Sequence, residues 1–400
     1  MKRRRIADLL IFSMLLSLTA CSGSTGSINN TTETEEVSES EQEPEVQDTH
    51  SNDGRNVVGI SMPSQKLERW NRDGSFLKQQ FEQDGYEVLV SYGNDLIDDQ
   101  INGIEDMIKE GADLLIITPI DATSLTGVLK DAADANIPVI SYDRLILQSP
   151  YIDYYISFDN YKVGTLQGEF IRDALDLDHA GDQTYNIEFV GGDPADNNAQ
   201  FFYGGAYDVL SPYIESGALT VLSGQTKFFE VATSSWSKDV AKERFEDIIN
   251  SYYGSGNELA AVCCSNDATA LGAQEALDLD YKGNNEIIIT GQDADEPNMK
   301  NIVDGKQSMT VYKALSNESV VAVALGKAII NGEKPGEELI QNGGWDFSCN
   351  YDTSSYDTGE KVVASYLLDP IVITAGNMKA ELVDKGYYTE DEQGYLHPVQ

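Results

Sequence analysis

Five short apolar segments, each typical of a buried strand, are followed directly by polar or charged side chains. These side chains include carboxylates, amides, a guanidinium and an ammonium group, so they offer both hydrogen-bond acceptors and donors. Such a mixture suits a ligand that carries several hydroxyl groups. The segments are Ile140–Tyr142 before Asp143 and Arg144, Phe189–Gly192 before Asp193–Asn198, Val262–Ser265 before Asn266 and Asp267, Ile289–Gly291 before Gln292 and Asp293, and Val311–Tyr312 before Lys313.

The position of these residues after strands has two explanations. In doubly wound sheets a ligand binds beyond the carboxyl ends of the strands. An Asp or Asn after a strand is also a common helix cap or turn residue, and for any one position this explanation stays open. Arg144 and Lys313 do not cap a helix N-terminus, and the polar bias recurs at all five strand ends. The pattern therefore predicts a polyol site.

Two tryptophans lie in suitable segments for covering the apolar C–H face of a sugar ring. Trp70 follows the first predicted strand closely, and Trp236 lies among polar residues in Thr233–Trp236. Packing in the core is the alternative for either of them.

Enzyme signatures are not found in this sequence. The three histidines, His50, His179 and His397, are not spaced for a catalytic triad or a zinc helix. No phosphate-binding loop or nucleophile elbow occurs, and no spacing selects a pair of carboxylates for glycoside hydrolysis. We expect a protein that is not an enzyme, with no cofactor and no metal.

Elements that could position these residues alternate between strand and helix. Strand-length apolar runs occur at 57–60, 88–90, 114–117 and 139–140, and a helical stripe is formed by Ile97, Ile101, Ile104 and Ile108 with Gly111 at its end. The pattern restarts after Phe158. About 345 residues remain without the N-terminal segments, more than one core usually organises. The fold class predicted is α/β, with two doubly wound parallel-sheet lobes.

The net charge limits the classes of ligand and partner, and the cysteine content limits the kind of domain. The formal net charge of -40 repels nucleic acid, favours a neutral ligand and keeps the chain soluble as a monomer. Cys263, Cys264 and Cys349 do not form the framework of a disulfide-stabilised domain, and the adjacent pair is predicted to be buried in a strand.

The N-terminal segment predicts an extracytoplasmic location. Basic residues, an apolar run from Leu9 to Leu18 and small residues before Cys21 are typical of a signal peptide over 1–20 that ends in a lipobox. We expect Cys21 to be lipidated and to anchor the protein to the membrane, whereas an ordinary leader is the alternative. Residues 21–55 are predicted to be a disordered acidic tether.

The motifs taken together resemble the sugar-binding proteins of ABC importers. They are most similar to the xylose-binding and ChvE-type multiple-monosaccharide-binding proteins, and the resemblance runs from about Val57 to Tyr388. The motifs that carry it are Arg69-Trp70, Tyr142–Ile146, Ile156–Asn160, Asp196–Ala199, Ser265–Ala268, Gly291–Ala294 and Thr310–Lys313.

This resemblance implies a periplasmic-binding-protein type I fold, whose two lobes are joined by a three-stranded hinge. It implies an N-terminal lobe of 56–158 with 293–313 and a C-terminal lobe of 159–292 with 314–400. The crossovers are expected near Phe158 and Asp159, near Gly291 and after Lys313. One pyranose is expected between the lobes, with Trp236 and Trp70 on its two faces. The first lobe is expected to hold it through Arg69, Asp143 and Arg144, and the second through Asn197 or Asn198 and Asp267. Asp293 and Lys313 are expected to hold it near the hinge.

The function implied is capture of a monosaccharide such as xylose, glucose or galactose and its delivery to the membrane permease of an ABC importer. Two alternatives stay open. The chain could present its closed form to a chemoreceptor or a sensor kinase as a sugar sensor, or it could be a secreted carbohydrate hydrolase. The sequence leaves the identity of the sugar open.

Overall fold

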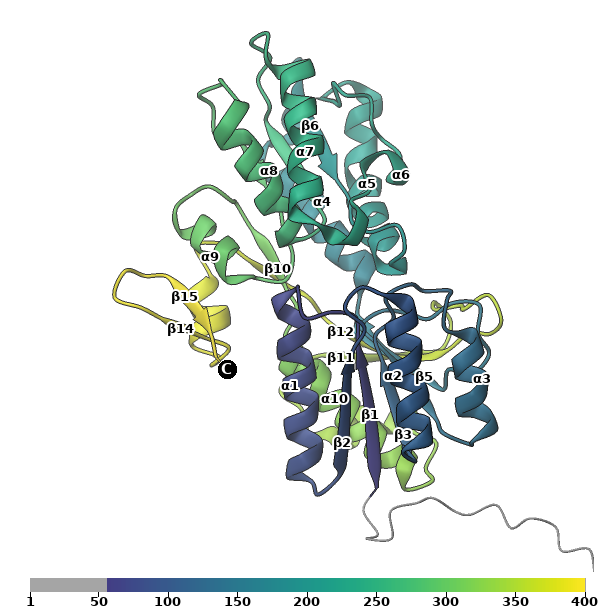
Figure 1. The fold of residues 1–400 in the computed structure, drawn as a ribbon. Coiled ribbons are helices and arrows are strands. Elements are labelled where there is room, and N and C mark those ends of the chain that lie inside the picture. Colours follow the sequence, from purple (N-terminus) through teal and green to yellow (C-terminus); the bar gives the residue numbers. More distant parts are fainter. Residues whose placement is uncertain (1–55, 400) are drawn as a thin grey trace, which may run out of the picture. The chain divides into compact units, whose positions relative to one another are not determined.

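A computed structural model describes residues 56–399 of the chain (Figure 1). The predicted signal peptide, Cys21 and the whole of the predicted tether over 21–55 lie outside the described residues. The first described part alternates strands and helices, as the sequence pattern predicts. Its elements are β1 (Val57–Met62), α1 (Glu68–Gln83), β2 (Glu87–Tyr92), α2 (Ile97–Lys109), β3 (Leu114–Ile117), α3 (Thr126–Asp134), β4 (Val139–Tyr142) and β5 (Tyr154–Phe158).

Helix α2 shows how the sequence produces this arrangement. Ile104 on its predicted apolar stripe is fully buried and packs with β3 residues such as Leu115, while acidic side chains begin the helix and Lys109 ends it. Gly111 has a positive φ of 81°, which confirms the predicted left-handed residue after the helix.

The sheet of the first lobe contains seven strands, and two of them come from late in the chain. The order is β11-β12-β5-β4-β3-β1-β2, in which β11 (Cys349–Asp352) is antiparallel to β12 (Ala364–Leu368) and the other neighbours are parallel. Helix α10 (Leu315–Ile330) buries Val321 and Leu325 against strands of this sheet, and α11 (Glu338–Gly343) follows it. The assignment of 314–400 to the C-terminal lobe is therefore wrong for α10, β11 and β12.

The second lobe has a four-stranded parallel sheet in the order β7-β6-β8-β9. Cys263 and Cys264 are buried in β8, as predicted. Its elements are α4 (Asn160–Ala174), a 3-10 turn (Leu177–His179), β6 (Tyr185–Val190), α5 (Asn197–Ser216), β7 (Leu219–Thr220), α6 (Phe228–Val231), a second 3-10 turn (Ser234–Trp236), α7 (Lys238–Ile248), a π-helical turn (Ile249–Tyr253), β8 (Ala261–Cys264), α8 (Asp267–Asp280) and β9 (Ile288–Ile289).

Glycines bring α4 and α5 of this lobe into close contact. A Cβ atom on Gly164 would lie 1.9 Å from the carbonyl oxygen of Phe202, and one on Gly205 would lie 2.1 Å from that of Tyr161. Only glycine permits this approach. The contact fixes the N-terminus of α5, which supplies side chains to the site described below.

A smaller segment completes the second lobe. It comprises α9 (Glu296–Val303), β10 (Thr310–Tyr312), β13 (Ile371–Ile373), a π-helical turn (Lys379–Val383) and the hairpin of β14 (Tyr388–Glu390) and β15 (Leu396–Pro398), which share one apolar cluster. The amide of Val311 donates to Gly291 O at 2.9 Å, so β10 continues from the edge of the second sheet. The assignment of 293–313 to the N-terminal lobe is therefore wrong.

Three connections join the two sheets. The chain crosses after Phe158, after Lys313 and between Leu368 and Ile371. The predicted crossover near Gly291 is wrong, because the chain stays with the second lobe there, and the missing crossover lies at Asp369-Pro370. Across this hinge Lys162 Nζ and Asp369 Oδ1 form an ion pair of 2.7 Å.

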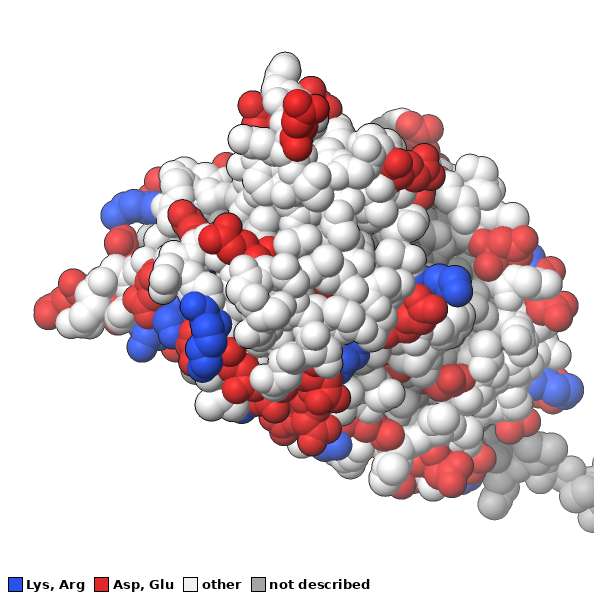
Figure 2. Space-filling model, turned by 90° about the horizontal axis from the view of Figure 1, so that it is seen from above, with Lys and Arg blue, Asp and Glu red and all other residues white. Residues whose placement is uncertain are grey.

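The described residues contain no helix that is both long and apolar enough to cross a bilayer. In Figure 2 acidic side chains are spread over the visible face, and basic side chains are scattered among them. Such a surface repels polyanions.

Candidate functional site

A small cavity of about 20 Å³ lies where the carboxyl ends of strands from both lobes meet. Its lining combines charged, amide and aromatic side chains. The lining residues are Leu67, Arg69, Trp70, Asp143, Arg144, Asp196, Asn198, Phe202, Trp236, Asn266, Gln292, Asp293 and Lys313.

Arg69 is the centre of a buried charge cluster in this wall. It lies in the first turn of α1, directly beyond β1, and its side chain is 7 % exposed. Nη2 lies 2.8 Å from Asp143 Oδ2 and 3.2 Å from Asp73 Oδ2, and Nη1 lies 3.2 Å from Asp293 Oδ1. Lys313 Nζ is 3.4 Å from Asp143 and 3.6 Å from Asp293. Alternating charges thus hold each acceptor and donor in place.

The protonation state of this cluster follows from these contacts. Burial acts to raise the pKa of Asp143, but Arg69, Lys313 and Arg144 outweigh it and lower that pKa to about 2. Burial also acts to lower the pKa of Arg69, and the surrounding carboxylates hold it above its ordinary value. At neutral pH the cavity therefore presents an ionised acceptor beside an ionised donor.

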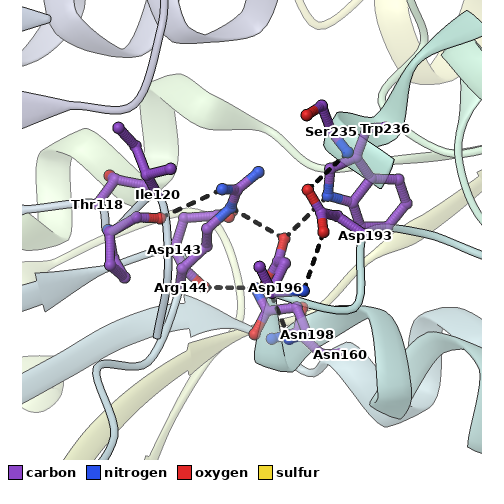
Figure 3. Close-up of polar contacts among 12 residues, drawn as sticks. Thr118, Ile120, Asp143, Arg144, Asn160, Asp193, Asp196, Asn198, Ser235 and Trp236 are labelled. Carbon is purple, nitrogen blue, oxygen red and sulfur yellow. Dashed lines mark hydrogen bonds and ion pairs between the residues drawn. The ribbon is translucent and has the colours of Figure 1, made fainter. Parts of the chain in front are cut away.

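Arg144 reaches from the loop after β4 to the second lobe (Figure 3). Its Nε lies 2.9 Å from Asp196 Oδ2, and Nη1 donates to Pro119 O at 3.2 Å. Its guanidinium carbon is 5.0 Å from the ring centre of Trp70, within the range of a cation–π contact. Arg144 therefore connects the walls that the two lobes contribute.

Asp196 has three partners. It caps α5 by accepting from the amide of Asn198, it pairs with Arg144, and it accepts from Trp236 Nε1 at 3.2 Å. Burial raises its pKa above the ordinary value, while Arg144 acts in the opposite direction. One residue thus serves both as a helix cap and as a polar contact between the lobes.

Asp143 is held in a left-handed conformation, with φ at 57°. Its carbonyl oxygen accepts from Ser157 Oγ at 2.7 Å, from Tyr155 Oη at 2.8 Å and from Asn198 Nδ2 at 2.7 Å. These donors offset the strain of a non-glycine residue at positive φ. Asn198 belongs to the second lobe, so the turn at Asp143 is stabilised by both lobes.

Aromatic rings form the less polar part of the wall. Trp236 and Phe202 have ring centres 6.1 Å apart and are tilted by 60°. A Cβ atom on Gly192 would lie 1.9 Å from the Trp236 ring, so only glycine lets the ring occupy this position. Trp70 is 2 % exposed and lies under the Arg69 guanidinium at 4.3 Å. Such rings can cover the C–H faces of a polyol.

The structure brings together most of the residues predicted from the sequence. The cavity wall contains Arg69, Trp70, Asp143, Arg144, Asn198, Trp236, Asp293 and Lys313.

Asn197 and Asp267 are not in the wall. Asn197 begins α5 and is half-buried. Asp267 is fully buried behind the wall, where it accepts from Gln307 Nε2 at 2.9 Å, Thr310 Oγ1 at 3.0 Å and the amide of Asp295 at 2.9 Å. It therefore holds the β9–β10 connection rather than facing the cavity.

Five wall residues are not among those expected to contact the sugar: Leu67, Asp196, Phe202, Asn266 and Gln292. Asp196, Asn266 and Gln292 nevertheless lie in the polar strand-end segments from which the site is predicted. Asp196 and Asn266 directly precede predicted site residues, but each also caps a helix, and the cap was the simpler explanation. Phe202 lies one helical turn beyond Asn198, and this spacing could have identified it.

The chemistry of the wall is that of binding. Each carboxylate of the cavity is paired with a cation or caps a helix. The described residues hold no group of three or more His, Cys, Asp and Glu side chains arranged to bind a metal ion.

Known proteins are similar to this chain in sequence and fold. Residues 58–334 match the family described as periplasmic binding protein domain. The multiple sugar-binding periplasmic protein SbpA of Azospirillum brasilense is 40% identical over 337 residues, which cover 84% of this chain and 90% of SbpA. The D-xylose-binding periplasmic protein of Escherichia coli is 34% identical over 335 residues, with 84% of this chain and 92% of that protein covered.

A solved structure of a binding protein is also similar to this chain. The ABC transporter solute-binding protein of Clostridium phytofermentans, with bound β-D-glucose, is 46% identical and superposes with a TM-score of 0.78 over 84% of this chain and 99% of that one. These relatives are named as binding and transport proteins, not as enzymes. The type I fold of two parallel-sheet lobes and three connections agrees with these similarities, and the chain belongs to the periplasmic binding protein domain family.

Proposed function

We propose that this chain captures a neutral aldose, such as glucose, xylose or galactose, between its lobes and delivers it to the permease of an ABC importer. The observation that carries the proposal is the cavity wall, in which ionised donors and acceptors alternate and aromatic rings lie beside them. The names of the relatives, which include sugar-binding, D-xylose-binding and glucose-bound proteins, support the same ligand class.

The roles of the side chains follow from their chemistry. Arg69, Arg144 and Lys313 donate to sugar oxygens, and Asp143 and Asp293 accept from sugar hydroxyls. Asn198 and the rings of Trp70 and Trp236 complete the contacts. Asn197 and Asp267 have no direct contact with the sugar in this proposal, because neither lines the cavity.

The mechanism is hinge closure driven by the ligand. Each lobe supplies part of the wall, so the sugar makes its full set of contacts only when the lobes are together. A ligand shifts such an equilibrium by its difference in affinity for the two arrangements. The three connections at the hinge permit this motion without unfolding either sheet.

A thermal-shift panel tests the ligand class. D-xylose, D-glucose, D-galactose, L-arabinose and D-ribose are compared at equal concentration, with D-glucuronate as a charged control. A ligand raises Tm with the logarithm of its concentration over Kd, so at least one neutral sugar should raise Tm strongly. The proposal fails if none of the five sugars raises Tm.

We also propose that Cys21 is lipidated and that the acidic segment over 21–55 leaves the folded part near the membrane. The support is the lipobox sequence and the apolar run before it. Cys21→Ser should release the protein from the membrane fraction into the soluble fraction. Unchanged membrane association of this variant would contradict the proposal.

A further inference from the structure

Two buried acids lie behind the cavity wall without lining it. Glu318, in the first turn of α10, is 0 % exposed, and neither of its carboxylate oxygens has a hydrogen-bond partner among the described residues. Asp73, on α1, is also 0 % exposed, and only its Oδ2 is paired, with Arg69. Burial without donors strongly disfavours an ionised carboxylate.

Charges face Asp73 from every element around it. Arg69 and Arg72 lie on its own helix, Asp143 follows β4, and Glu318 lies on α10. The hydroxyl groups of neighbouring tyrosines also interact with it. Asp73 and Glu318 are surrounded by charged and titratable groups from four elements. These groups are Arg69 and Arg72 from α1, Tyr92 from β2, Tyr142 and Asp143 from β4 and the turn after it, and Tyr312 and Lys313 from β10 and the residue after it.

The charge balance requires protons in this region. The cavity wall and the buried residues behind it contain three cations, Arg69, Arg144 and Lys313, and six acids, Asp73, Asp143, Asp196, Asp267, Asp293 and Glu318. If all the acids were ionised, the buried cluster would carry an excess of negative charge. Protons on Glu318 and Asp73 reduce this excess.

The protonation equilibria agree with this balance. Burial, together with Asp143 and Asp73, raises the pKa of Glu318 well above its ordinary value, which favours the neutral acid. Burial raises the pKa of Asp73 to about 6, although Arg69 acts to lower it. Asp73 is therefore the acid of the pair that changes its charge near neutral pH.

We propose that Asp73 positions Arg69 and takes up a proton when a sugar draws the lobes together, with Glu318 as its permanently neutral neighbour. The inference rests on the proposed function and adds a proton to the binding reaction. Its consequence is that the affinity for sugar rises as the pH falls through about 6.

The direction follows from what closure does to Asp73. In this structure the Asp293 carboxylate of the second lobe lies 3.2 Å from Arg69, the cation that pairs with Asp73. This contact disfavours the ionised form of Asp73, since it brings a competing negative charge to the same guanidinium. The pKa of Asp73 is then higher in the closed arrangement than in the open one. A group with a higher pKa in the bound state takes up a proton on binding, and binding is stronger at low pH.

Titration calorimetry with D-glucose measures this directly. At about pH 6 the binding heat should vary with the ionisation enthalpy of the buffer, and the slope should give uptake of a fraction of one proton. Kd should decrease about three- to tenfold between about pH 8 and about pH 5, as a pKa difference of up to one unit requires. The parent chain alone suffices for this measurement.

Variants then assign the proton. Asp73→Asn should bind D-glucose without buffer-dependent heat and with a flat pH profile. Glu82→Gln, on the exposed part of the same helix, is the matched control and should keep the proton uptake. Glu318→Gln should also keep it, because a neutral acid is replaced by a neutral amide of similar shape.

The outcomes separate the two proposals. If neither D-glucose nor any of the other four sugars gives binding heat at any pH between about 5 and about 8, the proposed function fails. If a sugar binds with the same Kd at every pH and without proton uptake, the inference is overturned while the function stands. Uptake that persists in Asp73→Asn would also overturn it.

Discussion

Arg144→Met should weaken sugar binding severely while leaving the fold intact. The substitution removes the cation that lies 2.9 Å from Asp196 and donates to Pro119 O at 3.2 Å. It keeps an unbranched side chain but removes the guanidinium that lies over Trp70. Asp196 is 4 % exposed, so its carboxylate would remain buried without its cation.

The magnitude follows from the burial of the pair. Removing one partner of a buried, hydrogen-bonded charge pair costs about 2–4 kcal/mol. This free energy corresponds to a Kd about 30- to 1,000-fold higher. An exposed pair would give a far smaller change, since such pairs contribute about 0–1 kcal/mol.

The assay is titration calorimetry with the sugar that gives the largest thermal shift, accompanied by circular dichroism to verify folding. Arg172→Met is the matched control, because Arg172 forms its ion pairs on the surface of α4. Asp196→Asn retains the cap on α5 and completes a double-mutant cycle with Arg144→Met. A Kd within threefold of the parent for Arg144→Met, or no coupling in the cycle, would refute the reasoning.

Three further predictions concern the wall and its support. Trp236→Phe should abolish most of the change in tryptophan fluorescence on sugar binding, and an unchanged signal would count against a contact with this ring. Asp267→Ala should lower the free energy of unfolding by about 2–4 kcal/mol in urea titrations, because three donors lose their acceptor, whereas unchanged stability would show that these bonds contribute little. The pKa of Asp143 is lowered to about 2, so its ion pairs stabilise the fold above about pH 4 and are lost as the pH falls towards 2. The stability difference between the parent and Asp143→Asn should therefore shrink in that range, and a constant difference would contradict the assigned pKa.

The sequence predicts the local structure and the position of the site well. The apolar stripe that contains Ile104 predicts which face of α2 is buried, and the apolar run of β3 predicts that this strand is buried. In both cases the signal lies within the segment itself. The carboxyl ends of parallel strands meet at one edge of a sheet, so Asp143 after β4 could be placed at the site from its strand position alone. Lys313 follows β10, which lies outside that sheet and pairs with β13, so its approach to Asp143 depends on how the two lobes meet.

Pairing between distant segments could not be predicted in the same way. Helix α10 and strands β11 and β12 have apolar patterns that fit the sheet of either lobe, and only packing against β5 decides between them. Asp267 shows the same limit for a side chain. Asp267 is the first residue of α8 and directly follows Asn266. The two neighbouring side chains point in different directions, so Asn266 lines the cavity whereas Asp267 accepts a hydrogen bond from Thr310.

The turn at Asp143 limits how this protein can be engineered as a sugar sensor. Its carboxylate faces the ligand cavity, while its carbonyl oxygen accepts a hydrogen bond from Asn198 of the other lobe. A substitution there would change ligand preference and the amplitude of the conformational signal together. Phe202 and Leu67 line the same cavity without polar side-chain atoms. Libraries confined to these two positions should retune selectivity while the signal remains intact.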